Sequence, residues 1–187
     1  MFRSSVHVLK LEMADLQVGH LRFLHELESP FLNNSREPKT DDLILAALVC
    51  SMPHRDARKF LLRWYLKPFL RLWAWRTRKC NLVYEFAFFR NYLAESIETR
   101  KVKKANGGKE LHTPLHQRLY LMLVEDMNHD PEEAWDVSVR EAIDLWMARA
   151  EKQGALEYWS DQEIAHWEWH QEQERKWAEQ QQETVTA

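Results

Sequence analysis

Apolar residues recur at intervals of three or four along most of the chain, which is the spacing of one face of an α-helix. Leu21, Leu24 and Leu27 follow this spacing, and the pair Ser29–Pro30 ends the run. Residues 43–49 are apolar on nearly every side, so we expect a short buried helix there. Four glycines give too few turn signals for a many-stranded fold. The pattern therefore predicts an all-α protein.

Prolines and polar residues set the expected ends of the elements in the first half of the chain. Partial alternation over residues 6–11 predicts a short strand or arm. A lone strand is only marginally stable, so it would need a small hairpin or a partner chain. Pro68 predicts a break or kink in a helix over residues 54–79, since proline removes a donor and clashes with the preceding turn. Asn81 is expected to cap a long helix that runs to about Lys104.

The second half of the chain carries clearer capping signals. Thr113–Pro114 opens a helix, and Asp130–Pro131 caps a short helical turn. Ser138–Glu141 is a capping box before a helix that Gly154 ends. A second capping box over residues 160–163 opens a last helix of mixed charge. These signals predict an irregular multi-helix bundle with an extended acidic C-terminal helix.

The sequence divides at Asn106–Gly108, its strongest loop signal. We expect an N-terminal helical part over residues 1–105 and an acidic C-terminal part over residues 109–187, as two domains or as one continuous domain. Residues 53–111 hold fifteen Lys and Arg against five acids, a balance of +10. Residues 125–187 hold five against seventeen, a balance of −12. The two halves of the chain therefore carry opposite net charge. This asymmetry indicates that the protein binds other macromolecules, or that its two halves dock on each other.

The cysteine content points to a reducing compartment. Cys50 and Cys80 lie far apart and outside any CxxC spacing, so the sequence predicts free buried thiols and neither disulfides nor a cysteine zinc site. No stretch has the apolar core of a signal peptide or the length of a membrane span. We therefore expect a cytoplasmic protein outside the membrane.

The most distinctive pattern is a series of cations four residues apart, which would form one ridge on a helix. The series is Arg55, Lys59, Arg63, Lys67 and Arg71, with Trp73 and Trp75 after it. Such a ridge could track a phosphate backbone while its aromatics stack on bases, lie on an anionic membrane, or bind an acidic protein helix. It could equally be a solvated face that pairs with the acidic half of the chain. Because that half opposes a polyanion, we favour protein partners over nucleic acid.

The last expected helix carries a tryptophan pair and a histidine pair. Trp167 and Trp169 stand two positions apart, about 200° around the helix axis, so both cannot enter one core. One of them is expected to anchor a partner or to lie along neighbouring Glu and Gln side chains. His166 and His170 share a face, as metal-binding pairs do, but the HExxH order and a third nearby histidine are missing. The sequence therefore predicts no metal site.

Motifs of catalysis and of nucleotide binding do not occur in the sequence. The chain has no GxSxG, no P-loop and no GxGxxG. Its carboxylates lie on expected helical faces, where charges are usually solvated. We therefore expect no catalytic residues, no cofactor and no enzymatic activity.

Five segments together carry a family resemblance. They are residues 16–24 (LQVGHLRFL), 28–31 (ESPF), 40–50 (TDDLILAALVC), 130–142 (DPEEAWDVSVREA) and 151–154 (EKQG). They lie in two stretches, residues 16–50 and 130–154, which make up about a third of the chain. These stretches resemble the small helical proteins of tailed bacteriophages that are tail assembly chaperones or neighbouring tail proteins. The resemblance implies a protein that binds the extended tape measure protein in the infected cell and delivers tail-tube subunits to it.

Three functions follow as alternatives. The first is a non-enzymatic assembly or chaperone factor that binds other proteins reversibly, alone or as an oligomer. The second is a nucleic-acid-binding protein that uses the basic helix over residues 55–79. The third is a structural component of a viral particle, whose N-terminal arm and acidic tail are ordered by neighbouring subunits. We expect the first of these.

Overall fold

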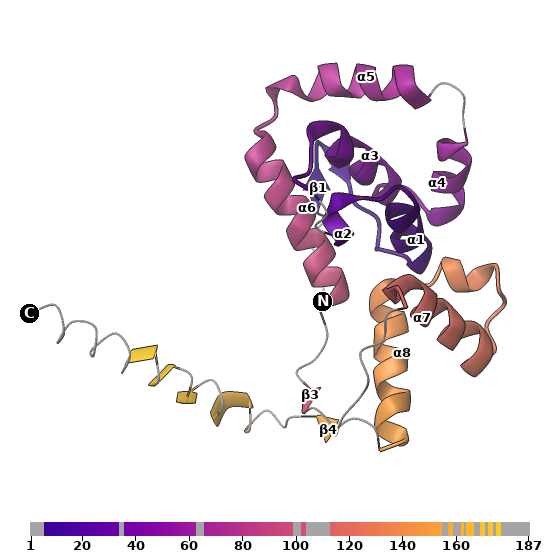
Figure 1. Cartoon of the computed structure of the whole chain (residues 1–187), viewed down its shortest axis with the longest axis vertical. Helices are drawn as coiled ribbons and strands as arrows, with labels where there is room; N and C mark the ends of the chain where they lie inside the picture. Colours follow the sequence, from indigo (N-terminus) through magenta and orange to yellow (C-terminus); the bar gives the residue numbers. More distant parts are fainter. Residues whose placement is uncertain are drawn as a thin grey trace, which may run out of the picture. The chain divides into compact units, whose positions relative to one another are not determined.

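The computed structural model describes residues 6–33, 36–62, 66–98, 102–103, 113–154 and 157–158, together with 162, 164–166, 169–170, 172–173 and 175–176. This part of the chain is mostly helical, which confirms the predicted all-α fold (Figure 1). The elements in chain order are β1 (His7–Val8), β2 (Leu11–Glu12), α1 (Val18–Glu26), α2 (Pro30–Asn33), α3 (Thr40–Cys50), α4 (His54–Leu61), α5 (Leu66–Arg76), η1 (Thr77–Lys79), α6 (Leu82–Ile97), β3 (Val102–Lys103), α7 (Leu115–Leu121), η2 (Met122–Asp126), η3 (Glu133–Trp135), α8 (Val139–Lys152) and β4 (Glu157–Tyr158).

The N-terminal segment forms a small antiparallel hairpin of β1 and β2. Leu9 and Lys10 connect the strands with positive φ angles of 51° and 64°, the conformation that a tight two-residue hairpin turn requires. Leu9 is buried, and its backbone N–H donates to the Glu85 carboxylate of α6 at 2.6 Å. Of the two arrangements expected for this segment, the structure has the hairpin.

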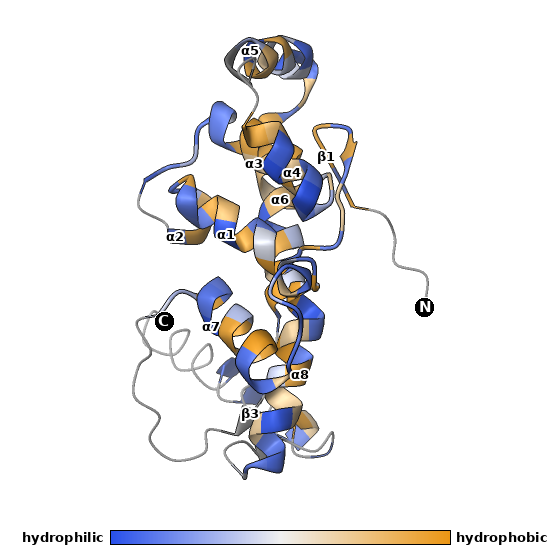
Figure 2. Ribbon diagram, turned by 90° about the vertical axis from the view of Figure 1, so that its right-hand side faces the viewer, coloured by the Kyte–Doolittle hydropathy of each residue, from blue (hydrophilic) through white to orange (hydrophobic). Residues whose placement is uncertain are grey.

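The buried centre of the fold is α3, as its all-round apolar sequence predicts. Seven of its eleven residues are buried, and α3 is coloured hydrophobic over much of its length in Figure 2, whereas α4 is mostly hydrophilic. In Figure 1, α4, α5 and α6 frame α3, and α3 contacts each of them and α1. Burial on all sides explains why α3 carries no polar face.

The predicted break at Pro68 is wrong in its position. The first helix of this region, α4, ends at Leu61, and α5 begins at Leu66, so Pro68 is the third residue of a new helix. In a first turn the backbone N–H has no intrahelical partner, so proline costs little there. The break therefore lies before Leu66, and α4 and α5 both contact α3.

The helix from Asn81 is shorter than predicted, because α6 ends at Ile97 and not near Lys104, and Asn81 makes no side-chain cap hydrogen bond. In the second half, α7 likewise has no side-chain cap hydrogen bond at its start after Thr113–Pro114, but the other two capping signals are confirmed. Ser138 Oγ accepts the Glu141 N–H at 3.2 Å, and Asp130 Oδ1 accepts the Glu132 N–H at 2.8 Å. Gly154 follows α8 with a φ of 68°. The box expected over residues 160–163 lies largely outside the described residues, but those described between 162 and 176 are helical.

The chain forms two compact units. The first comprises Met1–Glu98 and Leu111–Trp146, and the second comprises Thr99–Glu110 and Met147–Ala187, in which β3 pairs antiparallel with β4. The loop Asn106–Gly108 lies outside the described residues, so the division expected there stays a prediction. In the part of the chain that the structure describes, no helix combines the length and apolar character that crossing a bilayer requires.

Candidate functional site

The structure divides the predicted basic ridge between two helices. Arg55 and Lys59 lie exposed on α4, and Arg71 lies exposed on α5. Arg63 and the side chain of Lys67 lie outside the described residues. Because α4 and α5 are separate helices, the described members Arg55, Lys59 and Arg71 do not share one helical ridge. Two surfaces of the first unit result, one beside α4 and one on α5 and α6.

The first surface is a groove with an interior of about 920 Å³, which we name the α4 groove. Residues of α1 and α4 line it together with Tyr120 of α7 and the segment Pro131–Trp135. Its cations are Arg22, Arg55, Arg58 and Lys59, and its large apolar side chains are Phe23, Leu27, Leu61, Leu62, Tyr120 and Trp135. The α4 groove therefore combines an apolar lining with a cluster of positive charge.

Aromatic rings give the α4 groove a rigid wall. The rings of Tyr120 and Trp135 stack nearly parallel with centroids 4.1 Å apart. The Arg22 guanidinium lies 4.9 Å from the Trp135 ring, a cation–π distance, and its Nε also donates to Glu26 at 2.7 Å. Arg22 is therefore held by two contacts inside the protein.

A polar network fixes the helix ends at the α4 groove. The Gln17 side chain donates its amide N–H to the Asp136 carbonyl at 2.8 Å and accepts the His54 backbone N–H at 2.7 Å. The Asp136 carboxylate forms an ion pair with Arg55, with Oδ2 2.6 Å from Nε, and its Oδ1 lies 3.3 Å from His54 Nδ1. Gln17 and Asp136 thereby tie the N-termini of α1 and α4 to the segment after η3. Asp136 also balances the charge of Arg55.

His20 adjoins this network as a neutral, buried imidazole. Its Nδ1 accepts the Gln17 backbone N–H at 3.2 Å, so its Nε2 carries the proton and donates to the Met52 carbonyl at 2.9 Å. Burial lowers the pKa of His20 from 6.5 to about 4. Burial also lowers the pKa of His54, against the opposite effect of Asp136. Near pH 7 both imidazoles are neutral hydrogen-bonding parts of the fold.

Gly19 allows the His54 ring to pack against the backbone of α1. A Cβ added at Gly19 would lie 2.1 Å from His54 Cδ2, far inside van der Waals contact. The same ring stacks on Phe23 with centroids 4.9 Å apart. The missing side chain at Gly19 is therefore what lets α4 begin so close to α1.

The second surface is the exposed side of α5, η1 and the first half of α6, which we name the α5–α6 face. Large apolar side chains are exposed on it by 50 to 77%, namely Leu72, Trp75, Val83, Tyr84 and Phe88. Exposed cations accompany them, namely Arg71, Arg76, Arg78, Lys79 and Arg90. The one acid between residues 66 and 90 is Glu85, which the Leu9 N–H already engages. The α5–α6 face is therefore apolar and basic.

The aromatic residues predicted to bind partners have different surroundings. Trp75 is 66% exposed, whereas Trp73 is half-buried, and the Arg76 guanidinium lies 5.7 Å from its ring. Trp73 Nε1 is buried and has no hydrogen-bond partner among the described residues. Trp169 is 55% exposed in the second unit, with its ring 5.0 Å from that of His170. Trp167 lies outside the described residues, so Trp75 and Trp169 are the exposed pair.

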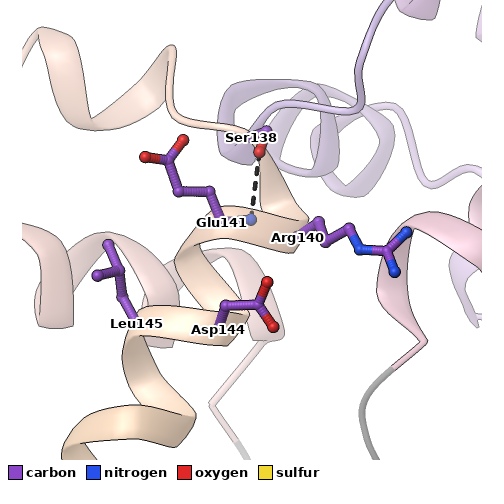
Figure 3. A pocket seen from close by; sticks show the side chains of 5 residues that line it. All are labelled: Ser138, Arg140, Glu141, Asp144 and Leu145. Carbon is purple, nitrogen blue, oxygen red and sulfur yellow. Dashed lines mark hydrogen bonds between the residues drawn. The ribbon is translucent and has the colours of Figure 1, made fainter. Parts of the chain in front are cut away.

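A second hollow, of about 380 Å³, lies along the first turns of α8 (Figure 3). Figure 3 shows Arg140 and Asp144 pointing to one side of the helix and Glu141 and Leu145 to the other. Opposite charges four residues apart are typical of a solvated helix face. We therefore assign no binding role to this hollow.

The two cysteines are free thiols in different surroundings. Cys50 is fully buried, as predicted, and burial raises its pKa to about 12. Cys80, between η1 and α6, is only half-buried, so the predicted burial is wrong for this thiol. Among the described residues, no Ser, Thr or Cys lines the α4 groove, and no three His, Cys, Asp or Glu residues are placed to hold a metal ion. No known protein family, curated protein or solved structure matches the chain. The functional proposals therefore rest on the chain's own residues.

Sequence reasoning identifies only part of these two surfaces. A signal for the α5–α6 face exists, because residues 82–89 of α6 are apolar on nearly every side apart from Glu85, while only Phe89, Tyr92 and Leu93 of this helix are buried. Such a helix must leave apolar side chains exposed unless it is covered on every side. The α4 groove has no comparable signal, since Arg22 and Trp135 meet only through the tertiary fold.

Proposed function

We propose that the chain is a non-enzymatic protein-binding assembly or chaperone factor of the phage tail morphogenesis type, and that the α5–α6 face binds its partner. The observation that carries the proposal is the exposure of five large apolar side chains on this face. Burying one such side chain against a partner gains about 1.5–3 kcal/mol. Aromatic side chains such as Trp75 and Tyr84 are also the anchors that dominate protein interfaces.

The cations of the α5–α6 face set the chemistry of the partner. Five Lys and Arg side chains are exposed on the same elements as the apolar residues, so a partner with acidic and apolar side chains is favoured in both approach and fit. The resemblance to tail assembly chaperones supports the tape measure protein as that partner, with tail-tube subunits as the protein to be delivered. On this proposal the chain works in the cytoplasm of an infected cell.

Biolayer interferometry with the tape measure and tail-tube proteins of the same genome tests the proposal. The double variant Trp75→Ala/Phe88→Ala should raise the Kd at least about tenfold, because it removes two aromatic anchors. Trp146→Ala is the matched control, since this tryptophan is 42% exposed but lies outside the α5–α6 face. The proposal is rejected if neither protein binds better than an unrelated one, or if the double variant binds as tightly as the unmodified chain.

Nucleic-acid binding is the second candidate, and one observation favours it. Arg71, Arg76 and Lys79 are exposed and lie within four residues of the exposed Trp75, and cations with an exposed aromatic ring are the combination that binds single strands by charge and stacking. A salt titration with a single-stranded oligonucleotide of about 20 bases separates this function from the first. Each phosphate contact should add about −0.7 to the slope of log K against log salt, and Arg71→Ala/Lys79→Ala should flatten it by about 1.4. Absence of binding at about 50 mM salt rejects this function.

A further inference from the structure

The α4 groove carries opposite charges on two neighbouring elements, unlike the uniformly basic α5–α6 face. Arg58 and Lys59 of α4 supply positive charge, and Glu132 supplies negative charge at the other lining segment. Glu133 follows it and is also exposed. Residues 125–136 hold six acids and no Lys or Arg, so this segment is strongly acidic. The α4 groove is therefore a surface with a basic side and an acidic side.

Some of the groove charges are already balanced within the protein. Arg22 is paired with Glu26, and Arg55 with Asp136. Lys59 lies 3.4 Å from Asp56, but these side chains are 74% and 59% exposed. An ion pair as exposed as this one contributes little to stability. Arg58 and Lys59 are therefore the cations of the α4 groove that a second molecule can use.

Between the two charged sides lies an apolar centre. Leu62 is 80% exposed at the end of α4, and Leu27 is 39% exposed at the end of α1. The stacked rings of Tyr120 and Trp135 continue this apolar surface. An apolar centre with a charged rim is the usual anatomy of a protein interface.

We propose that the α4 groove is the interface of a two-fold symmetric dimer of this chain. Arg58 and Lys59 of one copy face Glu132 and Glu133 of the second copy, and the reverse, around the apolar centre. A two-fold interface uses the same patch on both subunits, so the patch must complement itself, and a patch with a basic and an acidic side does so. A nucleic acid or an acidic peptide would instead meet the carboxylates of Glu132 and Glu133. A second copy is the occupant that uses both signs of charge.

Sedimentation equilibrium of the full chain tests the dimer directly. From about 1 to about 200 μM the chain should pass from monomer to dimer at about 50 mM NaCl. At about 500 mM NaCl the dissociation constant should rise at least about tenfold, because salt screens the charge pairs on the rim. A chain that stays monomeric over this whole range overturns the proposal.

A charge exchange tests which residues face each other. Arg58→Glu/Lys59→Glu and Glu132→Lys/Glu133→Lys should each weaken the dimer at least about tenfold, and an equimolar mixture of the two variants should dimerise again because opposite charges then meet. Leu62→Asp, at an exposed position where folding is not at risk, should weaken the dimer as well. The control Arg78→Glu/Lys79→Glu makes the same charge change on η1 and should leave the dimer intact.

Two results of the charge exchange would contradict the interface. Either the groove variants dimerise like the unmodified chain, or their mixture stays monomeric although each variant is folded by circular dichroism. The dimer does not depend on the proposed function, because partner binding is measured on the α5–α6 face with separate variants. Failure to dimerise contradicts the proposed interface, and failure to bind a partner contradicts the proposed function, so the two experiments distinguish which proposal has failed.

Discussion

Replacing Gly19 by alanine perturbs the closest approach between α1 and α4. The new Cβ would lie 2.1 Å from His54 Cδ2 and 2.4 Å from its Cγ, whereas ordinary contact begins near 3.4 Å. The ring cannot simply turn away, because it stacks on Phe23 and its Nδ1 lies 3.3 Å from an Asp136 carboxylate oxygen. The ring or the first turn of α1 must therefore move by more than about 1 Å.

Two costs and one gain determine how much Gly19→Ala changes the free energy of unfolding. Overpacking a filled site costs about 1–3 kcal/mol, and loss of the hydrogen bond between His54 and Asp136 adds about 0.5–1.5 kcal/mol. Alanine in place of glycine in a helix gains up to about 1 kcal/mol, and less at the second residue of α1 than in its interior. We expect a net loss of about 2 kcal/mol, which lowers the Tm by about 4–8 °C in a chain of this length.

The assay is a double-mutant cycle on urea unfolding with His54→Ala as the second change. Without the imidazole, Gly19→Ala should be neutral or stabilising by up to about 1 kcal/mol, because only the helix propensity remains. The sign of its effect should therefore differ between the two backgrounds. An equal cost in both, or a stabilising effect in the unmodified chain, would refute the close packing of His54 on Gly19.

Three further predictions follow from buried groups of the first unit. His20 has a pKa of about 4 in the fold against 6.5 unfolded, so the unfolded chain binds more protons between these values and stability is lost as the pH falls through this window. Urea midpoints should indicate a loss of about 2 kcal/mol between about pH 7 and about pH 5, and His20→Gln should flatten this dependence. Ser138→Ala removes the cap on the Glu141 N–H and should lower the free energy of unfolding by about 1 kcal/mol in the same assay, whereas Ser138→Asp should retain the cap. Phe89→Ala removes a fully buried ring that contacts Phe31 and should cost about 3–5 kcal/mol by thermal unfolding.

Local signals predict the elements of this fold well where one residue decides the outcome. Ser138 and Asp130 cap their helices as their spacing indicates, and α3 is buried because its sequence leaves no polar face. The position of the break before α5 is not determined by the residues at the break. Pro68 can begin a helix as easily as interrupt one, and packing of α4 and α5 on α3 decides between the two.

The α4 groove could not be predicted from spacing, because its lining residues come from distant parts of the chain. Gln17 bonds to residues 37 and 119 positions away, and no periodicity reports such a contact. More of the α5–α6 face could be predicted from the sequence. Trp75 and Arg71 were expected to contact partners and are exposed, while Val83 and Phe88 required the knowledge of which side of α6 is buried.

Arg55 and Arg71 belong to the same four-residue series, yet the fold gives their charges different surroundings. Arg55 is paired at 2.6 Å with Asp136, a residue of the acidic half of the chain, so internal pairing holds at this position. Arg71 is exposed on the α5–α6 face, where Glu85 is the only nearby acid in sequence and is bonded to Leu9. A charge that is already paired gains little from an incoming carboxylate, because the new contact must replace the old one. Affinity for an acidic partner should therefore depend on Arg71 and little on Arg55, although the sequence presents them as equivalent members of one series.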